Sequence, residues 1–234
     1  MSIRPDAPAI LSDGQEVKVH GSEAFPFAVY CGIMPTFIPA YPLHYHEEME
    51  LICCEAGCGS ITIDRKTVPL QPGEVAVILP GQIHAIAAEG NGTFSYYNIL
   101  FRFSLLELPD SETYRRFLAP LADGSMEVPA RIQKDSPLGR ELSENVWMLI
   151  EKRKENTALR IKACLYGVMD TLCKAATPAR HPTGGEHRDT RLLRQTVQYV
   201  DRHYPEKITV AAISAECGYS SSHFMKRFHD LTGT

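Results

Sequence analysis

Four side chains in the first half of the sequence have the types and spacing of a divalent metal site. They are His44, His46 and Glu50 in the pattern H-x-H-x3-E, and His84 in the pattern P-G-x-x-H. If residues 44–50 form a regular strand, side-chain alternation places the first three on one face. Imidazole and carboxylate ligands suit zinc, iron, nickel or manganese. We call these four residues the histidine–glutamate cluster, and a divalent metal is one interpretation of it.

Two other interpretations of the same cluster stay open. The polar side chains can contact an organic effector directly, without a metal, or simply fill the mouth of a barrel. Tyr41 and Tyr45 flank the cluster, and aromatic rings of this kind stack on a sugar or enclose an apolar ligand. The candidate effector-binding residues are His44, His46, Glu50, His84, Tyr41 and Tyr45. The sequence does not choose among these interpretations.

The end of the chain carries a second pattern, which predicts two helices joined by a tight turn. Thr209 is a predicted N-cap, and small or apolar residues recur after it at helical spacing. Gly218 can turn the chain at positive φ, and Ser220 then caps a helix over about 221–231 with Phe224 and Phe228 on its apolar face. The outer surface of that helix is polar and basic, as in a helix-turn-helix. The residues predicted to contact DNA are Ser221, Ser222, His223, Met225, Lys226 and Arg227.

This ordered series resembles the first helix-turn-helix of AraC/XylS-type transcription regulators. The matching positions are Ile208, Thr209, Ile213, Ser214, Gly218, Tyr219, Ser220, Ser222, Phe224, Arg227, Phe228, Thr232 and Gly233. The resemblance implies a DNA-binding domain with two such units joined by a long helix, and this chain stops after the first. The sequence is therefore expected to be part of a longer regulator.

The histidine–glutamate cluster looks like the two motifs of the cupin barrel, which commonly holds a divalent metal on three His and one Glu. The second motif is incomplete, because Ala88 stands where that motif ends in Asn. Many AraC-type sensor domains resemble this pattern without depending on a metal. The resemblance thus implies an effector-binding barrel and leaves its metal open.

The remaining elements follow from hydrophobic periodicity. Short apolar runs between residues 25 and 104, separated by turn signals, predict the strands of a barrel or sandwich. From about Pro137 the period becomes helical, first over 138–150 and again over 159–173, and the short connection implies an antiparallel pair. The predicted fold class is mixed α and β, with a cupin-like β-barrel, then a helical pair, then a partial all-α helix-turn-helix domain.

Charge and composition agree with a ligand module joined to a DNA module. Residues 1–106 contain 5 Lys and Arg against 11 Asp and Glu, a net charge of -6, whereas residues 188–234 contain 7 against 5, a net charge of +2. No apolar run has the length of a membrane span, and the N-terminus lacks the core of a signal peptide. We expect a cytoplasmic protein without a membrane partner, whose seven cysteines are reduced, small, buried residues.

The expected organisation comprises five segments: an N-terminal arm (1–19), an effector-binding barrel (20–106), a helical dimerisation region (107–176), a linker (177–189) and the partial DNA-binding domain (190–234). The expected partners are operator DNA, a small-molecule effector from a class that includes sugars, and a second copy of the chain. RNA polymerase is a further partner that the resemblance allows. The rival interpretation is a metal-dependent cupin isomerase or dioxygenase. The helix-turn-helix argues against it, so we predict no catalytic residue and no enzyme.

Overall fold

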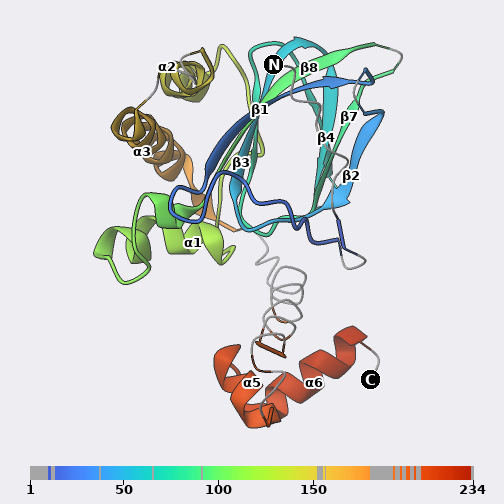
Figure 1. The fold of residues 1–234 in the computed structure, drawn as a ribbon, viewed down its shortest axis with the longest axis vertical. Coiled ribbons are helices and arrows are strands. Elements are labelled where there is room, and N and C mark those ends of the chain that lie inside the picture. Colours follow the sequence, from blue (N-terminus) through green and yellow to red (C-terminus); the bar gives the residue numbers. More distant parts are fainter. Residues whose placement is uncertain are drawn as a thin grey trace. The chain divides into compact units, whose positions relative to one another are not determined.

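The computed structural model of this chain divides into two units, Met1–Pro178 and Ala179–Thr234 (Figure 1). It describes residues 10–11, 14–36, 38–64, 66–90, 92–151, 155, 157–179, 192, 196, 199–200, 203 and 207–232. Each unit is described by itself below.

The first unit contains two antiparallel sheets that face each other (Figure 1). The five-stranded sheet has the order β1 (Phe27–Met34), β8 (Phe94–Phe101), β3 (Met49–Gly57), β6 (Val75–Ile78) and β10 (Arg131–Ile132). The four-stranded sheet has the order β2 (Ala40–His44), β7 (His84–Ala88), β4 (Gly59–Ile63) and β5 (Lys66–Leu70). A small third sheet pairs β9 (Met126–Glu127) with β11 (Thr177–Pro178). The mixed α and β fold class is confirmed, and the apolar runs of the sequence are its main strands.

Side-chain alternation in β3 separates two hydrophobic cores. Ile52 and Cys54 point between the two sheets, whereas Leu51 and Cys53 point to the outer face of the five-stranded sheet. Adjacent Cys53 and Cys54 therefore lie on opposite faces and do not form a joint site. All seven cysteines are unbridged; the expectation that they are buried is wrong for Cys31 and Cys58, which are exposed.

Helices cover the outer face of the five-stranded sheet. They are α2 (Pro137–Glu151) and α3 (Ala158–Ala175), with the shorter η1 (Phe103–Leu105), η2 (Tyr114–Leu118) and α1 (Ala119–Ala122) before them (Figure 1). Leu142 and Leu149 are 1% and 0% exposed within this single chain. Within the expected dimerisation region, these two side chains therefore pack inside the chain itself. Leu159 instead points outward and is 82% exposed.

The second unit contains α5 (Val210–Glu216) and α6 (Ser221–Thr232). Thr209 caps α5 by accepting a hydrogen bond from the Ala212 amide at 3.2 Å, and Gly218 turns the chain at φ 73°. Leu192, Cys217 and Phe224 form the buried core. Of the small residues that recur at helical spacing after Thr209, Ala211 and Ala215 are exposed, whereas Ser214 is buried.

The segment expected as a linker begins inside the first unit, since Thr177 and Pro178 form β11. The rest of the expected linker and the start of the expected DNA-binding domain, residues 180–191, lie outside the described residues. Among the residues that the structure describes, no helix is both long and apolar enough to cross a membrane.

Candidate metal centre and DNA-binding surface

The histidine–glutamate cluster is assembled at one end of the space between the two sheets. His44 ends β2 and His84 begins β7, and the register of these strands makes the two residues direct partners. His46 follows two residues after His44, and Glu50 lies in β3 of the opposite sheet. All four are buried, and one ligand atom from each lies within 4.8 Å of those of the others. The structure thus brings together the four residues that the sequence singled out.

The backbone fixes which nitrogen of each imidazole is free to bind. Each Nδ1 lies against a carbonyl oxygen, at 2.8 Å from Pro42 for His44, 3.1 Å from Glu48 for His46 and 2.9 Å from Gln82 for His84. A carbonyl oxygen only accepts hydrogen bonds, so each Nδ1 carries the proton. In the neutral ring, Nε2 then presents a lone pair. This orientation by a backbone carbonyl is typical of histidines that bind metals.

The Nε2 atoms converge on one carboxylate oxygen. Glu50 Oε2 lies 3.1 Å from His46 Nε2 and 2.9 Å from His84 Nε2. The His84 contact has the length of a hydrogen bond without its alignment, so this buried Nε2 has no hydrogen-bond partner. A lone pair on nitrogen that faces a carboxylate oxygen is stabilised by a proton or a metal ion between the two atoms. The residues therefore fit a divalent metal with three nitrogen ligands and one oxygen ligand.

Buried charge shifts the acid–base equilibria of the cluster. Burial lowers the pKa of His44 to about 4, and the neighbouring imidazole of His84 contributes in the same direction. For His46, burial lowers the pKa, but the hydrogen bond and charge of Glu50 outweigh it, so the pKa lies above its ordinary value. Burial raises the pKa of Glu50, yet contact with His46 and His84 holds it well below its usual range. A proton on His46 thus occupies the place of a metal.

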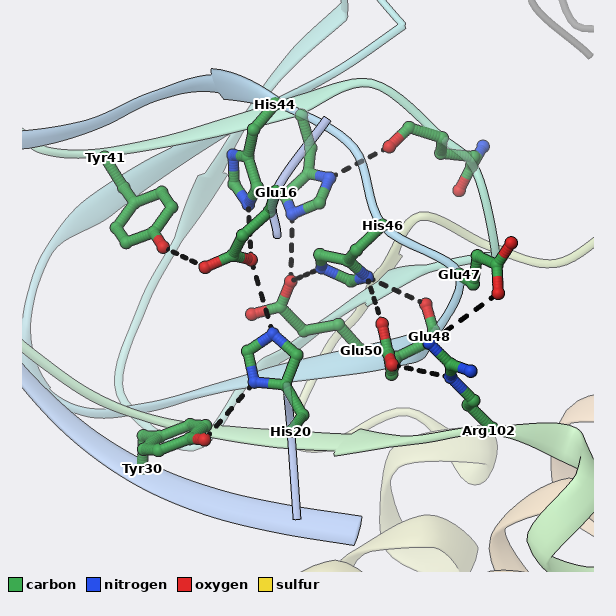
Figure 2. A network of polar contacts seen from close by, with 12 residues as sticks. Glu16, His20, Tyr30, Tyr41, His44, His46, Glu47, Glu48, Glu50 and Arg102 are labelled. Atoms are coloured by element: carbon green, nitrogen blue, oxygen red, sulfur yellow. Dashed lines mark hydrogen bonds and ion pairs between the residues drawn. The ribbon is translucent and has the colours of Figure 1, made fainter. Parts of the chain in front are cut away.

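Further polar residues that the sequence did not indicate surround the cluster (Figure 2). Glu16 and His20, both buried, come from the chain before β1, and Glu16 Oε2 lies 3.3 Å from His20 Nε2. Burial raises the pKa of Glu16, but its hydrogen bonds with His20 and Tyr41 outweigh this and lower it, so the carboxylate is ionised. No spacing connects residue 16 with residue 44, and only the fold brings them together.

The two tyrosines named with the cluster have different surroundings. Tyr41 donates a hydrogen bond to Glu16, and its ring centroid lies 4.6 Å from that of His44. Tyr45 is 5% exposed, and alternation places it on the opposite face of the chain from His44 and His46. Its ring lies beside Gly14. Tyr41 therefore belongs to the polar network, whereas Tyr45 fixes the segment that carries Glu16.

The second unit presents a polar and basic helix surface. Ser220 Oγ accepts a hydrogen bond from the His223 amide at 3.4 Å, and Ser214 Oγ lies 3.1 Å from Ser221 Oγ. Met225 is 50% exposed, although it is apolar. Of the predicted DNA-contacting residues, those exposed on α6 are Ser221, Ser222, His223, Met225 and Lys226, while Arg227 is half-buried. An exposed face of this composition suits a DNA groove.

Two family comparisons match this sequence. Residues 38–167 match the family described as AraC-like ligand binding domain. Residues 200–234 match the bacterial regulatory helix-turn-helix proteins of the AraC family. The chain belongs to the AraC family. The resemblance drawn from the sequence is thereby confirmed for both parts. No curated protein matches the chain.

Solved structures of related folds are similar at low sequence identity. A cupin 2 conserved barrel domain protein from Salinispora arenicola CNS-205 is 21% identical, with a TM-score of 0.30; the match covers 34% of this chain and 66% of that one, just under two thirds. The AraC-like transcriptional activator CuxR is 13% identical, with a TM-score of 0.42, over 89% of this chain and 68% of its own. ToxT from Vibrio cholerae is 10% identical, with a TM-score of 0.44, and the match covers 89% of this chain and 95% of ToxT.

Proposed function

We propose that this chain is a DNA-binding transcription regulator whose barrel binds a small effector at a divalent metal. The observation that carries the proposal is the convergence of three oriented imidazoles and Glu50 in the effector-binding domain of an AraC-family chain. The helix-turn-helix that follows the barrel in sequence binds the operator DNA in this proposal. Effector binding changes DNA binding only if the effector has different affinity for the two states of the protein.

In this proposal the metal ligands are His44, His46, Glu50 and His84. A bound divalent ion supplies Lewis acidity, which holds oxygen atoms of the effector. Tyr41 and Glu16 lie beside this position and add a hydroxyl and a carboxylate for hydrogen bonds. Such a site selects an effector with oxygen donors, a class that includes sugars.

The test of the metal proposal is elemental analysis of the purified protein, followed by titration of operator DNA. We expect about one divalent ion per chain, and DNA affinity that changes when effector is added to the metal-loaded protein but not after chelation. If the protein contains no metal and its DNA affinity still changes with effector, the proposed regulator is supported and the proposed metal site is contradicted.

A regulator of this kind needs no turnover, and we infer that the chain is not an enzyme and acts in the cytoplasm, where its operator lies. A metal-dependent cupin isomerase or dioxygenase is the alternative that the cluster chemistry allows. Assays of the metal-loaded protein with candidate sugars and oxygen separate the two, since only an enzyme converts its ligand. Contact with RNA polymerase at the promoter is part of the same proposal.

We predict that Lys226 and Met225 contribute to operator binding. Lys226→Ala should lower affinity for all DNA sequences and reduce the salt dependence, because it removes a phosphate-attracting charge from an exposed helix face. Met225→Ala should change the base preference at one position of the operator, because an apolar side chain contacts the methyl group of thymine. Electrophoretic titrations at two salt concentrations measure both. Lys66→Ala, on exposed β5, is the matched control and should bind DNA as the parent does.

We propose that a second copy of the chain pairs through the outer face of α3. Leu159 is 82% exposed and Tyr166 41% exposed, and exposed Ala163 lies between them on the same helical stripe. An exposed apolar stripe of this kind marks a partner surface. The buried Leu142 and Leu149 cannot form that surface.

Leu159→Glu should therefore convert dimers to monomers without loss of fold, as measured by sedimentation and circular dichroism. Leu149→Glu should instead unfold the first unit, because it places an unpaired charge in the core. Thr67→Glu adds the same charge on exposed β5 and should leave the dimer intact. A Leu159→Glu variant that sediments as a dimer would show that α3 is not the contact.

A further inference from the structure

The connection between β2 and β3 carries the one member of the histidine–glutamate cluster that lies outside these strands. His44 ends β2, Glu50 lies within β3 and His84 begins β7, so strand pairing fixes the position of each. His46 follows β2 and precedes β3. Its carbonyl accepts a hydrogen bond from the Gly81 amide at 2.8 Å, which holds the backbone but not the ring. The orientation of the His46 imidazole therefore depends on other contacts.

Glu48 faces the His46 ring with both its backbone and its side chain (Figure 2). The Glu48 carbonyl accepts a hydrogen bond from His46 Nδ1 at 3.1 Å, and in this orientation Nε2 lies 3.1 Å from Glu50 Oε2. The carboxylate of Glu48 faces the same Nδ1, with Oε2 at 3.7 Å. That separation is too long for a hydrogen bond, so the bond that orients the ring is the one to the carbonyl. The position of residue 48 thus decides where the imidazole points.

An ion pair fixes the side chain of Glu48. The residue is 3% exposed, and a buried carboxylate costs free energy unless it is paired. Arg102 supplies the partner, because its Nε donates to Glu48 Oε1 at 2.8 Å, while its Nη2 lies 3.6 Å from Glu47 Oε2. Strand register brings the two together. Met49 pairs with Phe101 in antiparallel strands, so the residue before the first faces the residue after the second.

We propose that Glu48 and Arg102 are positioning residues of the metal centre: their ion pair fixes the bend from which the Glu48 carbonyl holds the His46 ring. This inference rests on the proposed metal site. Without Arg102 the carboxylate of Glu48 is a buried, unpaired charge, which turns toward water and moves the carbonyl of the same residue. The His46 ring then loses the hydrogen bond that directs its Nε2 at the metal. Groups that orient a metal ligand in this way contribute about 10–100-fold to metal affinity.

Positioning and simple charge predict opposite effects for Arg102. If charge alone matters, removal of a positive group near a cation site strengthens cation binding. If Arg102 positions His46, its removal weakens binding. We therefore expect the Co²⁺ affinity of the full chain to fall about tenfold in Arg102→Met and in Glu48→Gln, and the visible Co²⁺ spectrum to change in both, because His46 is displaced. Arg102→Lys keeps a charged donor and should bind Co²⁺ more tightly than Arg102→Met does.

Arg131→Met is the matched control, because it breaks an ion pair of the same kind elsewhere in the sheet. Arg131 donates to the buried carboxylate of Glu74 at 2.9 Å and 2.7 Å. Glu74 precedes β6 at the end opposite to the one that pairs with Glu50. The control should lower thermal stability and leave Co²⁺ affinity and spectrum as in the parent. A double variant with Glu48→Gln and Arg102→Met should bind Co²⁺ no more weakly than the weaker single variant, since both changes break one contact.

The outcomes separate the positioning pair from the metal site on which it rests. Parental or tighter Co²⁺ binding by Arg102→Met would overturn the pair and leave the four-residue site intact. Equal weakening by Arg102→Met and Arg131→Met would also overturn it, because the effect would then follow from general stability. A parent protein that binds no Co²⁺ would contradict the metal site as well. Circular dichroism identifies the folded variants. If Arg102→Met does not fold, Glu48→Gln takes its place, and parental Co²⁺ affinity in that variant would reject the proposal.

Discussion

Replacement of His84 by alanine should abolish tight metal binding by the first unit. His84 is fully buried and directs an Nε2 without a hydrogen-bond partner at Glu50, so alanine leaves one of the four ligand positions empty. Loss of a supporting residue alone costs about 10–100-fold in metal affinity, and we expect loss of this ligand to cost at least about a hundredfold. The parent should gain about 2.7 kcal/mol of stability at a metal concentration 100 times Kd. Calorimetric titration and thermal unfolding with and without metal measure both effects.

His229→Ala removes an exposed imidazole from the second unit and is the matched control. It should bind metal as the parent does. If His84→Ala bound metal with parental affinity, the four-residue site would be refuted, and direct contact with an effector would become the better account of the cluster.

Metal affinity should also fall as the pH falls. His46 has a raised pKa, so a proton begins to compete for its Nε2 above the ordinary titration range of histidine. The pKa of His44 is about 4, so its Nε2 stays available until the solution is strongly acidic. The affinity should therefore decline first through the range of His46. A constant affinity between pH 8 and pH 5 would contradict this assignment.

The second large effect is expected in the DNA-binding unit. Phe224→Ala should cost about 3–5 kcal/mol, the typical cost of removing a fully buried phenylalanine side chain. Phe224 is 3% exposed and packs with Leu192 and Cys217 in the buried core that the described residues of this unit form. A loss of this size is a large fraction of the stability of an ordinary domain, so the unit should unfold while the first unit remains folded. Circular dichroism and proteolysis measure the two units separately.

Phe228→Ala provides the graded comparison. The Phe228 ring stacks on that of Phe224 with centroids 5.6 Å apart, but the residue is only half-buried, so its loss should cost less. The sequence placed both rings on the apolar face of the helix, and the structure buries only Phe224 fully. Equal destabilisation by the two substitutions would show that the core extends over Phe228.

Local pattern determined most of the elements of this protein. Alternating and continuous apolar runs identified the main strands, and helical periodicity identified α2, α3 and α6, because each of these buries one face against a core. The short β2 was not identified, since Pro42 and the exposed Leu43 interrupt its pattern. The histidine–glutamate cluster was recognisable because three of its members share one stretch of chain. The single regular strand expected over residues 44–50 is wrong, since β2 ends at His44 and β3 begins at Met49 in the other sheet, so the fold rather than alternation places Glu50 opposite the histidines.

Only the tertiary structure decided which groups meet across the chain. His84 joins His44 because β2 and β7 pair in that register, and Glu16 joins them because an isolated bridge to Tyr45 places it there. Leu142 and Leu149 lie in the region expected to mediate dimerisation, yet the barrel of the same chain covers them. An apolar row shows that a residue must be buried but not what buries it. Periodicity describes one element at a time, whereas burial and charge pairing depend on neighbours that are distant in sequence.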